Sequence, residues 1–415
     1  MKNKKLSIGL KAAMAILTVT LSATNTHAAT EKLLYSFDAN NKGGKDPYTA
    51  LISDTTGNLY GTTLLGGASG YGAVFEVVKP TGSGGWTQRI LHSFDNNGKD
   101  GYRPYAGLVF DGNGNLYGTT NQGGTHNGGT VFELSPRTGG GWTEKILHSF
   151  NNNGADGYDP YAGLVLDGLG NLYGTTPFGG ANSGGTVFEL TLTHEGWTEN
   201  ILYSFNPNSQ DAYEPFAGLI FDDSGNLYGT TVDGGALGGG TVFELILTGE
   251  TWAENILHNF NANDGTPYTP YAGLVFDGHG NLYGTTLNGG AGYGAVFELL
   301  VPTEDGWTEK TLHSFLDNGK DGNTPYGGVI LDTAGNLYGD TTNGGSDGKG
   351  VVFELAKPNG GGPWSEKLLH TFNANERGTD GEDPQASLFL YGGNLYGTTS
   401  LAGHRGGGTV FEIVP

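Results

Sequence analysis

The pentapeptide Gly-Asn-Leu-Tyr-Gly recurs along this chain, and no other feature of the sequence constrains the fold as strongly. The spacing between successive copies is almost constant, which leaves no room for an unrelated domain between them. Self-similarity at a fixed period is the sequence signature of a repeat architecture. The seven copies begin at Gly57, Gly114, Gly170, Gly225, Gly280, Gly335 and Gly393.

Each repeat contains four short segments that read as β-strands. They follow the patterns P-Y-x-G-L-x-x-D, G-N-L-Y-G-T-T, G-T-V-F-E-L and W-T-E-x-I-L-H-S-F, separated by stretches rich in glycine, asparagine and aspartate. β-Branched and aromatic residues bounded by turn formers, with no sustained 3.6-residue period, exclude a helical repeat. We therefore predict an all-β fold, a seven-bladed β-propeller with four antiparallel strands per blade.

The two ends of the chain predict how the ring closes. The last repeat stops after the segment 410–413, its third strand, so its fourth strand is missing. Residues 31–37 (E-K-L-L-Y-S-F) align without gaps with residues 144–150 (E-K-I-L-H-S-F), a fourth strand of the second repeat. The N-terminal strand is therefore expected to complete blade seven.

Residues 1–28 are predicted to be a cleaved signal peptide. A basic start is followed by an apolar run from about Ala12 to Leu21 and by small residues up to Ala28. We expect a secreted or periplasmic protein without a membrane span, because no segment approaches the length of a transmembrane helix. The single domain is expected over 29–415, with repeats near 47–94, 104–150, 160–205, 215–260, 270–315, 325–372 and 384–415 plus 31–37.

Composition narrows the classes of site and partner. The absence of cysteine excludes disulfides, thiolate metal sites and cysteine nucleophiles. A formal net charge of −22 argues against binding to phosphate backbones, so no nucleic acid partner is expected.

The repeat also resembles a known family. The segments G-L-V-F-D, G-N-L-Y-G-T-T, G-G and G-T-V-F-E-L are similar to the Gloeo-Verruco (GloVer) tandem repeat of exported bacterial proteins, and the resemblance covers essentially the whole mature chain. It implies export and a repeat fold. It transfers no catalytic residue.

One aromatic position in each repeat points to a ligand platform. It follows a proline at the start of the innermost strand, where six aromatic side chains are expected to ring one mouth of the channel, with Gln385 in blade seven. Amphipathic rings around a concave opening suit stacking on sugar faces, although they could equally pack between blades. These residues are Tyr48, Tyr105, Tyr161, Phe216, Tyr271 and Tyr326.

Blades six and seven depart most from the repeat. Asp340 replaces a threonine of G-T-T, Asp347 and Lys349 enter the following loop, and His404 and Arg405 stand in the same loop of blade seven. An acid, a base and two cations on neighbouring loops could bind an anionic sugar and act on it. Asp340, His404 and Arg405 are the candidate catalytic residues, and Asp347 and Lys349 join the candidate ligand-binding residues.

Polar residues repeated in every blade are interpreted as structural. The glutamates of V-F-E-L are expected to pair across strands, and the aspartates that close the first strand to form turns. The fourth-strand histidines alternate with Tyr35 and Tyr203, which favours packing or hydrogen bonding over metal binding, and no metal site is predicted. Loops such as 95–101 and 317–322 offer oxygen ligands for calcium but also read as turns, so calcium stays an alternative and no cofactor is identified.

These features favour a binding or scaffold protein, expected to be a monomer, that recognises a carbohydrate or cell-surface polymer on its loop face. An extracellular polysaccharide hydrolase or lyase is the first alternative. A structural envelope or matrix component is the second. The fold itself cannot choose among them.

Overall fold

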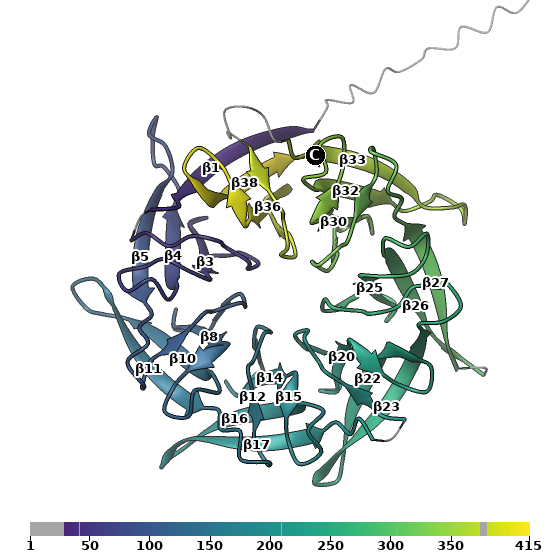
Figure 1. Cartoon of the computed structure of the whole chain (residues 1–415), viewed down its shortest axis with the longest axis horizontal. Helices are drawn as coiled ribbons and strands as arrows, with labels where there is room; N and C mark the ends of the chain where they lie inside the picture. Colours follow the sequence, from purple (N-terminus) through teal and green to yellow (C-terminus); the bar gives the residue numbers. More distant parts are fainter. Residues whose placement is uncertain (1–28, 41, 209, 305, 374–379) are drawn as a thin grey trace, which may run out of the picture.

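The computed structural model describes residues 29–40, 42–208, 210–304, 306–373 and 380–415, and its regular elements are all β-strands. The sheets are arranged as seven blades around a central axis, as Figure 1 shows, which confirms the predicted seven-bladed propeller. No helix in the described ranges is long and apolar enough to cross a membrane. The predicted signal peptide, residues 1–28, lies outside the described residues.

Each of the first six blades is a four-stranded antiparallel sheet whose strands follow one another from the axis outward. Blade one contains β2 (Ile52–Ser53), β3 (Leu59–Thr63), β4 (Ala73–Val78) and β5 (Thr87–Ser93). Blade two contains β7 (Val109–Phe110), β8 (Leu116–Thr120), β10 (Thr130–Pro136) and β11 (Trp142–Ser149). Blade three contains β13 (Val165–Leu166), β14 (Leu172–Thr176), β16 (Thr186–Thr193) and β17 (Gly196–Ser204). Blade four contains β19 (Ile220–Phe221), β20 (Leu227–Thr231), β22 (Gly238–Thr248) and β23 (Thr251–Asn261). Blade five contains β24 (Val275–Phe276), β25 (Leu282–Thr286), β26 (Ala295–Thr303) and β27 (Gly306–Ser314). Blade six contains β29 (Ile330–Leu331), β30 (Leu337–Thr341), β32 (Val351–Ala356) and β33 (Ser365–Thr371).

Blade seven is built from both ends of the chain. It contains β35 (Phe389–Tyr391), β36 (Asn394–Thr399) and β38 (Gly406–Val414), and β1 (Thr30–Asp38) pairs with β38 as its outermost strand. The pairing is antiparallel, and Figure 1 shows β1 along the outer side of β38, which confirms the predicted closure. Leu34 and Phe37 are buried, and the Phe37 ring lies 5.0 Å from that of Phe75 in blade one.

The repeated motif has a direct structural reason, seen clearly in blade two. Asp111 Oδ1 accepts hydrogen bonds from the backbone N–H groups of Asn113 and Asn115, as expected for a turn-forming aspartate. Gly114 has a φ of +84°, a left-handed conformation that favours glycine. Gly118 faces the ring of Phe132, where an added Cβ would lie only 2.7 Å from the ring. The glycines thus make the turn and allow the strands to pack.

The hydrophobic core lies between adjacent blades. Val131 of blade two, for example, shares a buried cluster with Phe188 of blade three. The glutamates of V-F-E-L pair across strands as predicted: Glu189 accepts hydrogen bonds from the Tyr173 hydroxyl at 2.7 Å and from Asn200 Nδ2 at 3.3 Å. Each blade therefore needs its neighbours to bury its apolar surface.

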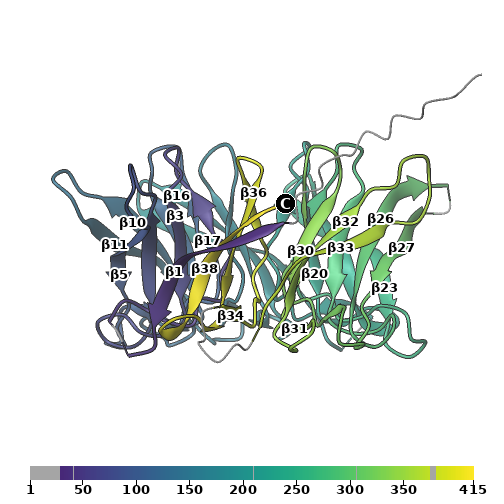
Figure 2. The same cartoon turned by 90° about the horizontal axis from the view of Figure 1, so that it is seen from above.

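Two kinds of loop meet on one face of the ring. The loop that leads into a blade pairs with the loop between its second and third strands, so both lie on the same face. Figure 2 shows β31 (Asn343–Gly344) and β34 (Gly381–Glu382) at the lower edge. In blade seven β37 (Leu401–Ala402) also pairs with β38. The short pairs are β6 (Gly101–Tyr102) with β9 (Gln122–Gly123), β12 (Gly157–Tyr158) with β15 (Phe178–Gly179), β18 (Ala212–Tyr213) with β21 (Asp233–Gly234), β28 (Gly322–Asn323) with β31 (Asn343–Gly344), and β34 (Gly381–Glu382) with β37 (Leu401–Ala402).

Candidate functional site

A cavity at the mouth of the channel is lined by one residue from each blade. Its volume is about 120 Å³. All of its lining side chains are half-buried, so each presents part of its surface to solvent. The lining residues are Tyr48, Tyr105, Tyr161, Phe216, Tyr271, Tyr326 and Gln385. The structure thus brings together the whole predicted aromatic ring; below, these seven residues are called the mouth ring.

Neighbouring side chains of the mouth ring contact one another. The Tyr105 and Tyr161 ring centroids are 4.8 Å apart, and the Phe216 and Tyr271 rings stack at 5.1 Å. The sequence left open whether these residues form a platform or pack between blades. They pack against one another and also line the cavity, so the mouth is narrow and its aromatic surface is continuous except at Gln385.

The residue two positions before each mouth-ring side chain holds the backbone in an unusual conformation. All seven precede proline and have φ values between +54° and +63°, a region that non-glycine residues rarely adopt. Each donates its backbone N–H to a carbonyl of the preceding blade, as Asp159 does to Gly128 at 2.8 Å. They are Asp46, Arg103, Asp159, Glu214, Thr269, Thr324 and Asp383. The surrounding hydrogen bonds therefore fix the mouth ring, because strained residues persist only where neighbours over-determine them.

The side chains of these pre-proline residues give the rim of the mouth an acidic character. Four are carboxylic acids, Asp46, Asp159, Glu214 and Asp383, and Arg103 is the one basic residue among the seven. Burial raises the pKa of all four acids, and that of Asp159 to about 6. Lys45 near Asp46 and Lys349 near Asp383 offset part of this charge.

The candidate catalytic residues are not brought together. Asp340 lies within β30, is 1 % exposed, and neither of its carboxyl oxygens has a hydrogen-bond partner among the described residues. Burial raises its pKa well above the usual range. His404 and Arg405 are exposed between β37 and β38, and the Arg405 carbonyl accepts a hydrogen bond from Ala39 beside β1. Asp340 is on a strand inside the blade, so it cannot meet a polymer on the loop face.

The two loop residues of blade six also differ in setting. Asp347 is exposed, whereas Lys349 forms an ion pair with Glu382 of the next blade at 2.7 Å between Nζ and Oε2. That carboxylate offsets the Lys349 charge. Lys349 is thus paired with the next blade, while Arg405 is exposed in the loop before β38.

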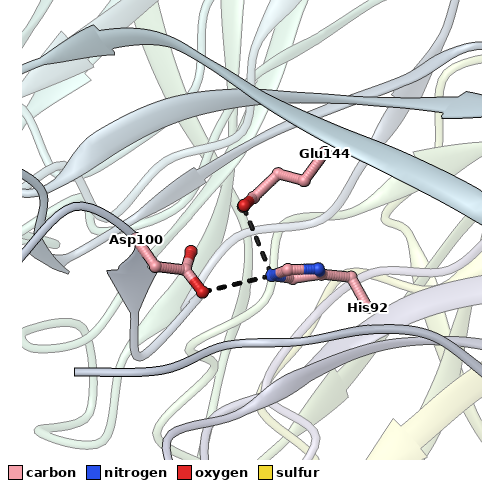
Figure 3. Close-up of side chains that lie close together, drawn as sticks. All are labelled: His92, Asp100 and Glu144. Atoms are coloured by element: carbon pink, nitrogen blue, oxygen red, sulfur yellow. Dashed lines mark hydrogen bonds and ion pairs between the residues drawn. The ribbon is translucent and has the colours of Figure 1, made fainter. Parts of the chain in front are cut away.

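A repeated cluster at the outer edge of the ring was missed from the sequence. A fourth-strand histidine, an aspartate eight residues later and a glutamate of the next blade place one ligand atom each within 4.8 Å of one another. Figure 3 shows the first, in which Nε2 of His92 lies 3.3 Å from both Oδ2 of Asp100 and Oε1 of Glu144. The clusters are His92/Asp100/Glu144, His148/Asp156/Glu199 and His313/Asp321/Glu366.

Burial and the charges of neighbouring side chains both shift the pKa values of these clusters. Burial raises the pKa of Glu144 to about 8 and those of Glu199 and Glu366 to about 7. Burial alone would lower the pKa of His148, but its bond to Asp156 and the charge of Glu199 outweigh that effect and raise it. As expected from the sequence, each of these histidines forms a hydrogen bond, here with the aspartate eight residues later.

Side chains of the loops considered for calcium form hydrogen bonds within their own loops. In the loop 95–101, Asn97 Oδ1 accepts hydrogen bonds from the backbone N–H groups of Lys99 and Asp100. Asp100 Oδ2 accepts the backbone N–H of Asp95. These side-chain oxygens thus stabilise the loop itself.

Solved structures share this fold at low sequence identity. A polysaccharide lyase, an ulvan lyase, matches with a TM-score of 0.54 and 11 % identity over 89 % of this chain and 93 % of its own. The extracellular domain of a hybrid two-component system protein from B. thetaiotaomicron matches with a TM-score of 0.53 and 13 % identity over 92 % of this chain and 39 % of its own. No curated protein matches the sequence. At such identity the likeness shows the fold alone.

The sequence itself matches one described repeat family. The Gloeobacter/Verrucomicrobia repeat matches residues 16–168, 140–317 and 292–415, which together include every blade. The match agrees with the resemblance carried by G-N-L-Y-G-T-T and G-T-V-F-E-L. This chain therefore belongs to the Gloeobacter/Verrucomicrobia repeat family.

Proposed function

We propose that this protein is a carbohydrate-binding propeller that holds a neutral glycan against its mouth ring. The observation that carries the proposal is the cavity lined by six aromatic side chains and Gln385. Aromatic rings offer apolar faces for sugar rings, and the tyrosine hydroxyls and the Gln385 amide offer hydrogen bonds to sugar hydroxyls. The fixed backbone lowers the entropic cost of binding.

The size of the cavity favours a polymer over an enclosed small molecule. Pockets that enclose a small ligand have volumes of roughly 300–1,000 Å³, whereas this cavity has about 120 Å³. A ligand must therefore lie across the mouth, with one sugar unit against the mouth ring. An extended glycan satisfies this geometry.

The acidic rim selects among polysaccharides. Asp46 and Asp383 lie near Tyr48, and Asp159 lies near Tyr161. Lys45, Arg103 and Lys349 offset part of their charge. A polyanion would meet like charges there, so neutral polymers are the preferred class. An anionic sugar, held by Lys349 and Arg405, stays the alternative.

Affinity electrophoresis through gels that contain neutral or acidic polysaccharides tests this function. Neutral polymers should retard the protein, and the double variant Tyr105→Ala/Tyr161→Ala should migrate as in a gel without polymer. Tyr102→Ala is the matched control, because Tyr102 lies on the same face, pairs with Tyr71, and does not line the cavity. Equal retardation of all three proteins would contradict the proposed site.

Cleavage is measured on the same polymers, since a polysaccharide lyase shares this fold. Reducing ends and the absorbance of unsaturated products would reveal a hydrolase or a lyase. Our proposal of a binding protein predicts neither signal. Product formation would make the protein an enzyme.

We also propose that the mature chain is exported after removal of residues 1–28. The basic and apolar N-terminal segment supports this. N-terminal sequencing of protein recovered outside the cytoplasm should begin at Ala29. Recovery of the whole chain inside the cell would contradict export.

A further inference from the structure

The junction of blades two and three carries a second cluster of polar side chains, away from the mouth ring. His148 lies on β11, Asp156 precedes β12, and Glu199 lies on β17 of the next blade. These three residues and His126 line one cavity of about 380 Å³. Two imidazoles and two carboxyl groups thus face a common space at the outer edge of the ring.

Each carboxyl group of this cluster has a buried oxygen atom that accepts no hydrogen bond from the described residues. Asp156 is 8 % exposed, and within the described ranges neither its Oδ1 atom nor Oε1 of Glu199 has a hydrogen-bond partner. Buried polar atoms are nearly always satisfied, so such atoms call for a proton, a water or an ion. A divalent cation would neutralise two carboxylates beside two neutral imidazoles.

The distances fit a transition metal. Nε2 of His148 lies 3.2 Å from Oδ2 of Asp156 and 3.6 Å from Oε2 of Glu199. Donor atoms around a tetrahedral Zn²⁺ with bonds of about 2.0–2.2 Å lie roughly 3.3 Å apart. Mixed imidazole and carboxylate donors suit Zn²⁺ and its first-row neighbours, whereas calcium and magnesium prefer oxygen alone.

His126 distinguishes this cluster from the other two of its kind. In the matching loop position, Ser69 stands beside His92/Asp100/Glu144 and Gly292 beside His313/Asp321/Glu366. Neither residue supplies an imidazole. His126 is exposed and does not belong to the group of ligand atoms that lie within 4.8 Å of one another. We propose that His148, Asp156 and Glu199 form a binding site for a divalent transition metal such as Zn²⁺, which joins blade two to blade three, and that the His126 side chain turns toward the bound ion as a further ligand.

Isothermal titration of the chelator-treated protein with Zn²⁺ tests the site. We expect one tight site per chain, lost in His148→Tyr and weakened in His126→Ala. The tyrosine variant should fold, because Tyr203 occupies the same position in blade three and its hydroxyl bonds to Asp211 and Glu254, both at 3.2 Å. Thermal melts should show that Zn²⁺ stabilises the wild-type protein and not His148→Tyr.

Two controls separate this site from general binding to an acidic surface. His92→Tyr changes the same repeat position at a cluster without a second histidine, and it should keep the tight site. Ca²⁺ and Mg²⁺ should produce no comparable heat or stabilisation. Absence of a tight Zn²⁺ site in the wild-type protein, or the same tight site in His148→Tyr, would overturn the proposal.

Discussion

Oγ1 of Thr285 in blade five donates a hydrogen bond of 3.0 Å to the carbonyl oxygen of Gly327 in blade six. The acceptor directly follows the mouth-ring residue Tyr326. The same threonine bonds recur at five other junctions: Thr62 to Ala106, Thr119 to Ala162, Thr175 to Ala217, Thr230 to Ala272 and Thr398 to Thr49. At the remaining junction Asp340 stands in place of the threonine, next to the blade whose mouth residue is Gln385.

Asp340→Thr is expected to stabilise the protein. The threonine would restore the bond to the next blade and remove a buried acid without partners among the described residues, and one hydrogen bond is worth about 1 kcal/mol. In a domain of this size each kcal/mol raises Tm by about 1 °C. Scanning calorimetry measures the shift. Thr285→Asp, the reverse change one blade earlier, should lower Tm, and an unchanged or lower Tm in Asp340→Thr would refute this interpretation of the junction.

The gain from Asp340→Thr should depend on pH. Burial raises the folded-state pKa of Asp340 above its ordinary value, so the folded protein keeps a proton that the unfolded chain releases. Wild-type stability therefore falls as pH rises above the ordinary aspartate range toward that raised pKa. The Tm difference between variant and wild type should be larger at pH 8 than at pH 4. A constant difference would show that the carboxyl group does not titrate in this window.

Closure by β1 should contribute several kcal/mol. Phe37→Ala removes a fully buried ring that packs on Phe75 across the junction of blades seven and one, and such truncations cost about 3–5 kcal/mol. Lys32→Ala is the control on the same strand: its side chain is 60 % exposed and its ion pair with Glu412 is worth about 0–1 kcal/mol. Denaturant unfolding gives both values. Equal stability of the two variants would argue against closure through β1.

Glu254→Gln should remove one source of alkaline destabilisation. Burial, followed by its contact with Asp211, raises the pKa of Glu254 to about 9, despite the opposing bond from Tyr203. Between the ordinary glutamate pKa, about 4.3, and this value the unfolded chain loses a proton that the folded protein keeps, so stability falls as pH rises. The glutamine variant should melt several degrees higher than wild type at pH 8 and about the same at pH 4. Glu250 is exposed, so Glu250→Gln should melt like the wild-type protein at both pH values. If Glu254→Gln also melts like the wild-type protein at both pH values, Glu254 does not keep a proton in the folded state.

The fold followed from the sequence because each repeat encodes its own turns and strands. Gly114 and Gly118 show the reason: one makes a left-handed turn and the other leaves room for the Phe132 ring, so the motif reports local geometry directly. The strand at residues 31–37 revealed the closure because it is a displaced copy of a fourth strand. The mouth ring followed from the Pro-Tyr or Pro-Phe step that precedes the innermost strand in six of the blades.

The remaining features depend on contacts between blades, which a repeat motif does not display. In the sequence Asp340 is only a departure from the second-strand motif G-T-T, because the burial of this position of β30 depends on the packing of the blades. His148 and Asp156 are visible as a pair eight residues apart, whereas Glu199 comes from the following repeat. Only the packing of neighbouring blades brings the three together.

The most direct test of the proposed function is the affinity of one retained oligosaccharide for the wild-type protein and for Tyr161→Ala, with Tyr102→Ala as the control, by isothermal titration calorimetry. Loss of one stacked ring should weaken binding by about 0.5–1.5 kcal/mol or more. We predict weaker binding to Tyr161→Ala and unchanged binding to Tyr102→Ala. The same affinity for all three proteins would contradict binding at the mouth ring.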